Sequence, residues 1–393
     1  MSDYDCAVIG AGMVGATTAL ALADIGLKVV LIDKYPVTDF SPEQAFDLRV
    51  SAISLASEQL LAQLGAWQQL QGWRLCPYQR LGVWEQENAY TEFNSDDIQQ
   101  AHLGHIVENR LLQLSLWQQV KQQSKITLLC PEQLQGFEQL ADEVQLTLTE
   151  QVITAKLLIA SDGANSQVRA LAQIGTTGWD YQQSAMLIHV ETSLDQQDIT
   201  WQQFFQTGPV AMLPLPGNNA SLVWYHQKAE IKRLSGLSND ALTAEIHQHF
   251  PRRLGSVKVL NKAAFNLTRR HANQYVKGRV VLLGDAAHTI NPLAGQGVNL
   301  GFKDVKALQL ALATAIGEGE SWYSAKTLNR YESARRTDNL LMMSTMDALY
   351  KTFSHPSPII KGIRNLGLMA VNYVPVLNKQ IKNKALAYAC GLS

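Results

Sequence analysis

The first candidate for chemistry is a glycine-rich turn near the N-terminus. It reads Gly10-Ala11-Gly12-Met13-Val14-Gly15 and lies between an apolar run ending at Ile9 and an Ala-rich stretch. Glycines at this spacing permit a tight turn, close approach of the backbone to a pyrophosphate, and close packing of a helix on a strand. The free N–H groups at the start of that helix favour an anion. The turn predicts a dinucleotide site, and the motif does not distinguish FAD from NAD.

An acidic residue follows at a suitable distance. Asp33 ends a second apolar run, Leu27 to Ile32, and stands 18 residues after Gly15. In dinucleotide-binding folds, an acid near this position accepts hydrogen bonds from a ribose hydroxyl. The strand, helix and acid together disfavour the alternative, a glycine-rich turn without a ligand.

A second motif, Asp162-Gly163, directly follows the apolar run that ends at Ala160. A DG pair after a buried strand predicts a turn that can approach a ligand, and an ordinary β-turn before a helix is the alternative.

A third motif, Gly284-Asp285-Ala286-Ala287-His288, follows another apolar run. The sequence NPLAGQGVNLG at 291–301 continues it into a helix. Small residues at a helix start leave N–H donors uncovered, which suits a flat or anionic ligand. Asp285 could then bond ribityl or ribose hydroxyls.

His288 invites a catalytic interpretation because histidine titrates near neutral pH. No Ser, Cys or metal partner accompanies it, so we expect it to orient the loop. The four cysteines are far apart and form no CxxC pair, which argues against disulfides and a zinc site and suits a reducing cytoplasm. They are Cys6, Cys76, Cys130 and Cys390. We therefore expect no metal.

Composition indicates a globular protein of two domains. The chain has 393 residues, 46% apolar and 17% charged, with a formal charge of −1. This balance excludes a disordered or fibrous chain. The sequence contains no basic stripe with interleaved aromatic residues, so it does not predict nucleic-acid binding. No apolar run reaches the length of a membrane span, and the N-terminus lacks the basic region of a secretory signal, so we expect a cytoplasmic protein.

Strand and helix patterns predict an α/β domain interrupted by a second domain. Alternating strand patterns with one helix indicate α+β structure around an antiparallel sheet. The predicted first domain is discontinuous and comprises residues 1–75, 101–178 and 268–345. The predicted second domain comprises residues 76–100 and 179–267, and residues 346–393 are predicted to be helical.

The three motifs in this order resemble the FAD-dependent aromatic monooxygenases with a para-hydroxybenzoate-hydroxylase-like fold. The resemblance implies a Rossmann-like FAD-binding domain, an inserted α+β substrate domain and a helical C-terminus. Arg49 matches an arginine near the flavin in this family, with a surface arginine as the alternative. The implied loop near the isoalloxazine contains Pro292, Gly295, Gln296 and Gly297. The implied FAD-binding residues are Gly10, Gly12, Met13, Val14, Gly15, Asp33, Arg49, Asn109, Asp162, Asp285, Gly297, Val298 and Asn299.

Nearly the whole chain resembles the ubiquinone-biosynthesis branch of these enzymes, through segments such as LRVSAIS at 48–54 and LGHIVEN at 103–109. Segments TWQQF (200–204), GPVAMLPL (208–215) and SLVWY (221–225) are most similar to the hydroxylases that act late, on a polyprenyl methyl-methoxy-benzoquinol. Candidates for the substrate pocket are Phe204, Met212, Trp224 and Tyr225, each with an ordinary core role as the alternative.

The resemblance implies that NAD(P)H reduces FAD and that O2 forms a C4a-hydroperoxyflavin, which hydroxylates the ring. It identifies no catalytic base. Alternatives are a sibling hydroxylase acting on a polyprenylphenol or polyprenyl-methoxyphenol, a flavin-dependent reductase, and a non-enzymatic scaffold. Homo-oligomers and a ubiquinone-biosynthesis complex are further expectations from the family.

The C-terminal segment has its own charge pattern. Residues 351–393 contain six basic and no acidic residues. Apolar residues recur there at spacings of three and four, namely Ile359, Ile363, Leu366, Ala370 and Tyr373. Such a helix could dock an anionic membrane surface, from which a polyprenyl substrate would come. Packing on the rest of the protein is the alternative.

Overall fold

The computed structural model describes residues 2–290, 297–355 and eight later residues: 357, 362, 364, 365, 383, 386, 390 and 391. Pro292, Gly295 and Gln296 of the expected flavin loop lie outside the described residues, as do the five apolar residues of the C-terminal pattern. Within the described residues, no helix combines the length and apolar character needed to span a membrane.

The first sheet is a mostly parallel layer that carries the N-terminal glycine turn. Its order is β17 (Val276–Lys277), β18 (Val280–Leu282), β11 (Val152–Ala160), β1 (Tyr4–Ile9), β2 (Val29–Ile32) and β8 (Ile126–Leu129). Two antiparallel strands extend β11 at one side, β10 (Val144–Leu148) and β9 (Leu134–Gln139). All four residues of β2 are buried, as an apolar strand covered on both faces should be.

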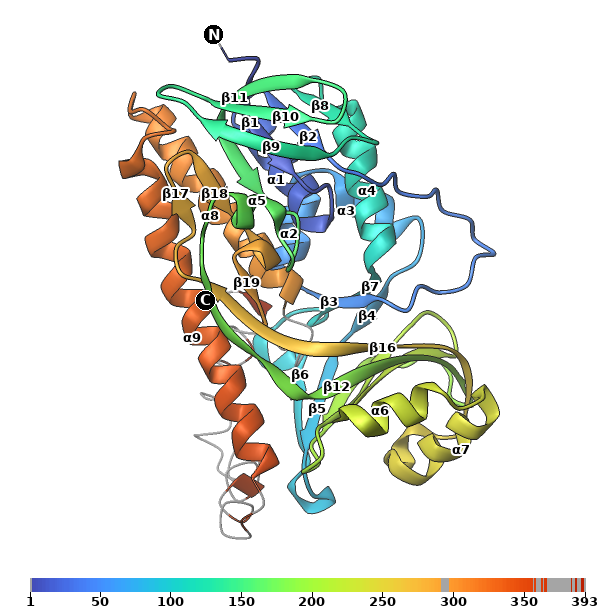
Figure 1. Cartoon of the computed structure of the whole chain (residues 1–393). Coiled ribbons are helices and arrows are strands. Elements are labelled where there is room, and N and C mark those ends of the chain that lie inside the picture. The colour runs from blue at the N-terminus through green and yellow to red at the C-terminus, as the bar shows by residue number, and fades with distance from the viewer. Residues whose placement is uncertain are drawn as a thin grey trace.

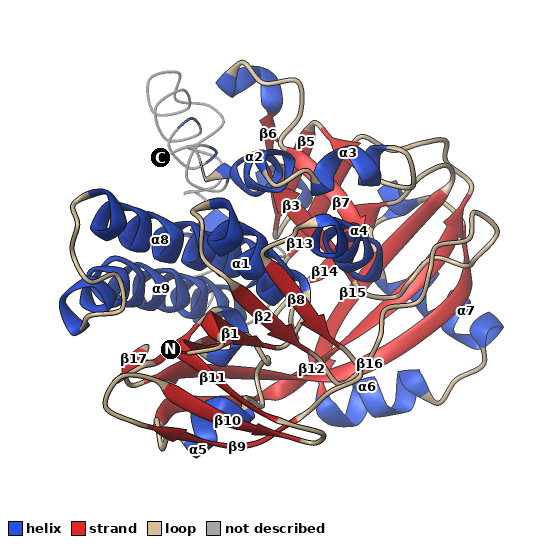
Figure 2. Ribbon diagram, turned by 90° about the horizontal axis from the view of Figure 1, so that it is seen from above, coloured by secondary structure: helices blue, strands red, loops and turns tan. Residues whose placement is uncertain are grey.

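Helices from distant parts of the chain cover this sheet. Helix α1 (Met13–Asp24) packs against α4 (Asn109–Gln122) and α8 (Gly297–Gly317), and α8 packs against α9 (Ala325–Ser354) (Figure 2). In Figure 1, α9 runs down one side of the molecule from the first sheet towards the second. Two shorter helices, α2 (Leu55–Gln63) and α3 (Ala66–Gln71), pack against α8 and α4 respectively, and α5 (Gln167–Leu171) follows β11.

The second sheet is largely antiparallel and lies below the first in Figure 1. Its order is β19 (His288–Thr289), β16 (Val257–Ala272), β12 (Thr176–Thr192), β15 (Asn219–Gln227), β14 (Val210–Pro214), β13 (Ile199–Gln203), β5 (Arg80–Trp84) and β6 (Thr91–Asn94). Helices α6 (Lys228–Ser235) and α7 (Asn239–His249) pack on it. A small third sheet joins β3 (Val50–Ser54), β7 (Gly104–Glu108) and β4 (Cys76–Tyr78).

One local expectation needs correction. The sequence predicts a single helix within 179–267, whereas α6 precedes α7. Only Ile231 and Leu234 of α6 are buried, so its apolar face is too short to give a helical period. The predicted domain limits stay a prediction.

Described residues of the C-terminal segment are anchored to the inserted sheet. Arg364 forms a buried ion pair with Glu85, just after β5, in which Nε donates to Glu85 Oε2 at 2.7 Å and Nη2 contacts Oε1. Asn365 donates to the same carboxylate at 2.7 Å. Farther along, Leu386 and Cys390 pack in a small apolar cluster with Leu103. These contacts favour the packed alternative for this part of the segment.

We predict that Arg364→Ala destabilises the protein. The change leaves Glu85 buried with its charge uncompensated, and breaking a buried pair in this way costs roughly 3–5 kcal/mol. A urea titration should show a lower unfolding midpoint. Arg233→Ala, which removes a solvent-exposed pair with Glu230, is the matched control and should change the midpoint little. Equal shifts in the two variants would contradict the anchoring role.

Candidate functional site

A cavity of about 610 Å³ lies where the first sheet meets β16 of the second. Its lining includes most of the residues singled out in the sequence: Gly12, Met13, Val14, Arg49, Asn109, Asp285, Gly297 and Val298. The volume falls within the range of small-molecule and cofactor sites. Segments more than 280 residues apart in the chain therefore meet around one space.

The glycine turn is held by close backbone packing. Gly10 has φ +93°, and a Cβ there would lie 2.6 Å from the Ser161 carbonyl oxygen. A Cβ on Gly15 would lie 1.7 Å from the Gly10 carbonyl oxygen. A Cβ on Gly12 would meet nothing within 4 Å. Gly10 and Gly15 thus serve the packing of the protein itself, whereas Gly12 keeps the cavity side of the turn open.

Helix α1 starts at this open side. Gly12 is its N-cap residue, and no side chain caps the helix start among the described residues. The first N–H groups of a helix have no partner within the helix, and the helix dipole gives this end a partial positive charge. The start of α1 can therefore hold an anionic group, such as a pyrophosphate.

Asp33 lies behind the turn and fixes its backbone. Its Oδ2 accepts a hydrogen bond from the Ala11 N–H at 2.6 Å, and its Oδ1 accepts one from the Tyr35 N–H at 2.9 Å. The Ala11 carbonyl in turn accepts hydrogen bonds from Gln113 and Trp117 of α4, at 2.9 and 2.7 Å. Asp33 has a structural task here, and its bond to a ribose hydroxyl stays a prediction.

Two polar atoms beside the cavity are buried without a partner among the described residues. They are the Ser161 hydroxyl oxygen and Asp162 Oδ1. Asp162 Oδ2 accepts a hydrogen bond from the Val168 N–H at 3.1 Å. Buried polar atoms normally have partners, so these two fit a ligand that supplies hydroxyl groups or other donors. With the uncapped helix start, they make the site suitable for a dinucleotide such as FAD.

Asp285 lines the cavity, and its side chain is exposed to that space. The surrounding protein partly desolvates the carboxyl and raises its pKa, and the charges of His288 and Arg49 partly oppose the rise. Asn109, at the start of α4, accepts a hydrogen bond from the Ser51 hydroxyl at 2.7 Å. The cavity lining thus combines the carboxyl of Asp285, the guanidinium of Arg49 and the amide of Asn109 with an apolar surface.

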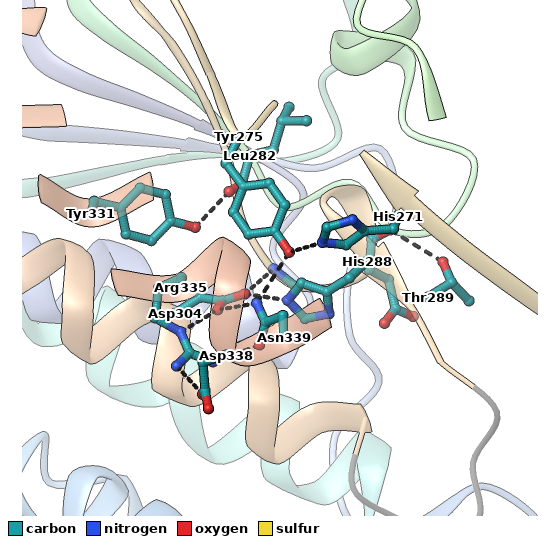
Figure 3. A network of polar contacts seen from close by, with 12 residues as sticks. His271, Tyr275, Leu282, His288, Thr289, Asp304, Tyr331, Arg335, Asp338 and Asn339 are labelled. Carbon is teal, nitrogen blue, oxygen red and sulfur yellow. Dashed lines mark hydrogen bonds and ion pairs between the residues drawn. The ribbon is translucent and has the colours of Figure 1, made fainter. Parts of the chain in front are cut away.

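A buried carboxylate holds the loop that carries Asp285 (Figure 3). Asp304 of α8 accepts hydrogen bonds from the Gly284 N–H at 3.0 Å and from His288 Nε2 at 2.5 Å. Arg335 of α9 donates to its other oxygen at 2.8 Å, and Asn339 does so at 3.0 Å. Burial opposes the charge on Asp304, but His288 and Arg335 outweigh this effect, and the pKa of the carboxyl is lowered. The geometry fits the expected role of His288 in orienting the loop.

The network continues to a second histidine. Asn339 donates to the Tyr275 hydroxyl at 3.2 Å, and this hydroxyl lies 2.9 Å from His271 Nε2. Because the hydroxyl already accepts from Asn339, it can donate to a neutral His271 ring. Burial, followed by the charges of His288 and Arg336, lowers the pKa of His271 to about 4.

The substrate-pocket candidates do not line this cavity. Met212 and Trp224 lie in the core between the second sheet and its helices, with the Trp224 ring 5.2 Å from that of Phe250. Phe204 stacks on Phe353 of α9 at 4.1 Å. Tyr225 belongs to another cluster with Leu267. The packing of Met212 and Trp224 favours the core alternative for both.

The sequence analysis missed the cavity wall formed by β16, which contains Phe265, Asn266, Leu267, Thr268 and Arg270. These residues belong to a long strand without a motif of its own. Their position next to the glycine turn arises from pairing with β12 and β19. The other expected residues that the structure describes do not line the cavity, namely Gly10, Gly15, Asp33, Asp162 and Asn299.

Comparison with known proteins places the chain in a family. Residues 3–342 match the model of the FAD binding domain family. The chain is 48% identical to the 3-demethoxyubiquinol 3-hydroxylase of Escherichia coli strain K12, over 99% of this chain and 98% of that protein. It is 34% identical to the ubiquinone hydroxylase UbiL of Rhodospirillum rubrum, over 97% and 89%. The crystal structure of p-nitrophenol 4-monooxygenase PnpA from Pseudomonas putida DLL-E4 shares the fold, with a TM-score of 0.79 at 19% identity over 98% and 96% of the two chains.

The fold and the site define an FAD-dependent monooxygenase of the para-hydroxybenzoate-hydroxylase-like class. The chain belongs to the FAD binding domain family and, within it, to the hydroxylases of ubiquinone biosynthesis. The resemblance found from the sequence motifs is confirmed, and so are the fold class and FAD as the cofactor. Family members of this type use NAD(P)H and O2 as co-substrates. The roles of individual residues stay predictions.

We predict that Gly12→Val folds but does not retain FAD. The backbone at Gly12 has φ −65°, which any residue can adopt, and a Cβ meets no protein atom within 4 Å. The added side chain would occupy the space next to the start of α1. The ratio of flavin to protein absorbance should fall strongly, while circular dichroism stays unchanged.

Gly136→Val is the matched control, because a Cβ there also meets nothing within 4 Å, and Gly136 lies on β9 and does not line the cavity. Full flavin content in Gly12→Val would contradict the assigned position of the pyrophosphate.

We predict that His271 makes the protein sensitive to mild acid. Its ordinary pKa of 6.5 applies to the unfolded chain, whereas its pKa in the folded chain is about 4. The unfolded chain therefore binds more protons between these values, and stability falls as the pH drops from 6.5 towards 4, by at most about 3 kcal/mol. Urea midpoints measured across this range should fall less steeply for His271→Gln. Parallel pH profiles for the two proteins would disprove the assignment.

Proposed function

We propose that this protein hydroxylates the ring of a demethoxyubiquinol, a polyprenyl benzoquinol that carries one methyl and one methoxy group. NAD(P)H would serve as the reductant and O2 as the source of the added oxygen. The observation that carries the proposal is the 48% identity, over nearly the full length of both chains, to a 3-demethoxyubiquinol 3-hydroxylase. The site is compatible with it, since an anion-binding helix start and apolar strand residues line the same cavity.

Each part of the cavity has a proposed task. Bound FAD supplies the activation of O2, and the protein binds it, orients it and excludes water. The start of α1 at Gly12 would hold the pyrophosphate, and Asp285 would accept hydrogen bonds from hydroxyls of the cofactor. Arg49 lies within electrostatic reach of Asp285 and lines the same cavity. Its charge would balance anionic parts of the cofactor.

The wall formed by β16 is the proposed surface for the aromatic ring. Phe265 and Leu267 provide apolar contact, and Asn266 and Thr268 provide polar groups from the same strand. A flat apolar pocket with a few polar anchors is what a substituted benzoquinol requires. Tyr225 lies in one cluster with Leu267 and Phe265, so it would support this wall from behind.

The alternatives differ in product. A sibling hydroxylase would act on a polyprenylphenol or polyprenyl-methoxyphenol, and a flavin-dependent reductase would oxidise NAD(P)H without adding oxygen to a ring. A homo-oligomer, a biosynthetic complex and peripheral contact with a membrane stay predictions. Such contact would give access to a polyprenyl substrate dissolved in lipid.

We predict that a strain lacking this protein accumulates a demethoxy quinone, one methoxy group short of ubiquinone. Mass spectrometry of the quinone lipids measures this directly. The wild-type gene should restore the normal profile, and the Gly12→Val gene should not.

Accumulation of an earlier ring, without the methyl or methoxy group, would assign the enzyme to a sibling step. A purified enzyme that consumes NAD(P)H and releases only hydrogen peroxide with the demethoxyubiquinol would contradict hydroxylation of that substrate.

A further inference from the structure

A cluster of metal-ligating side chains lies outside the cavity lining. It consists of Glu58 of α2, His102 in the segment before β7, and His105 within β7. One ligand atom from each residue lies within 4.8 Å of the others. Glu58 Oε2 is 2.9 Å from His102 Nε2 and 3.1 Å from His105 Nδ1. Three side chains from two elements thus converge on a single point.

These atoms match the ligand chemistry of zinc. Zn²⁺ commonly binds imidazole nitrogen and carboxylate oxygen at about 2.0–2.2 Å, and sites with three protein ligands leave a fourth position for water. When two ligand atoms bind the same ion at these distances with a ligand–metal–ligand angle of 90–110°, the two ligand atoms lie about 2.8–3.6 Å apart. The contacts of 2.9 and 3.1 Å fall within this interval. The three ligand atoms lie within 4.8 Å of one another, and the Glu58 carboxylate would turn off the line of its two hydrogen bonds to admit an ion between them.

The surroundings hold the ligands while leaving a path to solvent. His105 is buried, and its ring packs edge-on against Trp67 at 5.1 Å and against His102 at 4.3 Å. The side chains of His102 and Glu58 are partly exposed, at 22% and 19%. The Glu58 carboxylate is the common hydrogen-bond partner of both rings.

Without a metal, the Glu58 carboxylate accepts hydrogen bonds from His102 Nε2 and His105 Nδ1. For an ion to bind, each of these ring nitrogens must give up its proton and offer its lone pair. The charge of Zn²⁺ is then partly balanced by Glu58.

We propose that Glu58, His102 and His105 form a Zn²⁺ site that fastens α2 to β7. Both elements lead to the FAD cavity. Ser57 of α2 donates a hydrogen bond to Asn299 of α8 at 2.8 Å, and β7 runs directly into α4, which begins at Asn109. Bound Zn²⁺ therefore stabilises the frame of the cavity from outside. This proposal departs from the expectation of no metal, which rested on the cysteines and on His288.

The test is a zinc titration of the full-length, FAD-loaded protein after treatment with EDTA and desalting. Calorimetry with zinc sulfate gives affinity and stoichiometry, and thermal unfolding gives the shift in Tm. Wild type should bind one Zn²⁺ per chain and gain Tm. His102→Ala and Glu58→Gln should each bind more than roughly 100-fold more weakly, because even outer-shell partners of metal sites contribute about 10- to 100-fold.

His249→Ala is the matched control, because His249 forms a surface pair with Glu245 at 3.4 Å and should leave zinc binding unchanged. Flavin absorbance verifies that each variant is folded. If Glu58→Gln does not fold, His102→Ala decides the result, because the His102 side chain is partly exposed. The proposal is overturned if wild type binds no Zn²⁺ at micromolar concentrations. It is equally overturned if His102→Ala binds Zn²⁺ as tightly as wild type.

Discussion

The arrangement of the site depends on the hydrogen bonds and ion pairs of the buried Asp304 carboxylate. The chain leaves the first sheet at β18 and enters the second at β19, with only the Leu283–Ala287 segment between them. Asp304 binds both ends of this crossing, through the Gly284 N–H and the His288 ring. A buried charge is costly unless it is paired and fully hydrogen-bonded, and Arg335 and Asn339 meet that requirement. The relative position of the two sheets at the cavity is thus tied to α8 and α9.

The cavity is a product of this crossing. The first sheet contributes the glycine turn and the start of α1, which suit an anionic cofactor and leave little room for side chains. The second sheet contributes β16, whose cavity-facing residues combine apolar and polar groups. Neither sheet forms the site alone. In the function that we propose, the first sheet would hold the flavin and the second the aromatic substrate, so that both lie in one cavity.

The third sheet and its neighbours form a support next to the cavity. Asn299, at the start of α8, accepts hydrogen bonds from the Ser54 N–H and the Ser57 hydroxyl and donates to the Ala52 carbonyl. Residues of β3 and α2 are thereby fixed to the helix that follows the loop expected near the flavin. Glu58 of the proposed zinc cluster directly follows Ser57 in α2. The same short helix thus connects α8 with this partly buried cluster.

The sequence alone determined the features that depend on local backbone requirements. Gly10 and Gly15 can be identified because a φ of +93° at Gly10 and backbone contacts below 3 Å at both positions exclude any larger residue, whereas Gly12 is recognised from its spacing to them. Strands β1 and β2 are recognisable because strands buried on both faces are apolar throughout. These features predict the α/β fold and a dinucleotide site, and the resemblance of the three motifs, taken in order, to a known family implies FAD as the cofactor. Only the tertiary structure decided which side chains meet across long separations. The β16 wall and the partners of Asp304 come from strand pairing and helix packing, and the Glu58–His102–His105 cluster joins two elements more than 40 residues apart. Such contacts are set by the folding of the whole chain, which leaves no local period or spacing in the sequence.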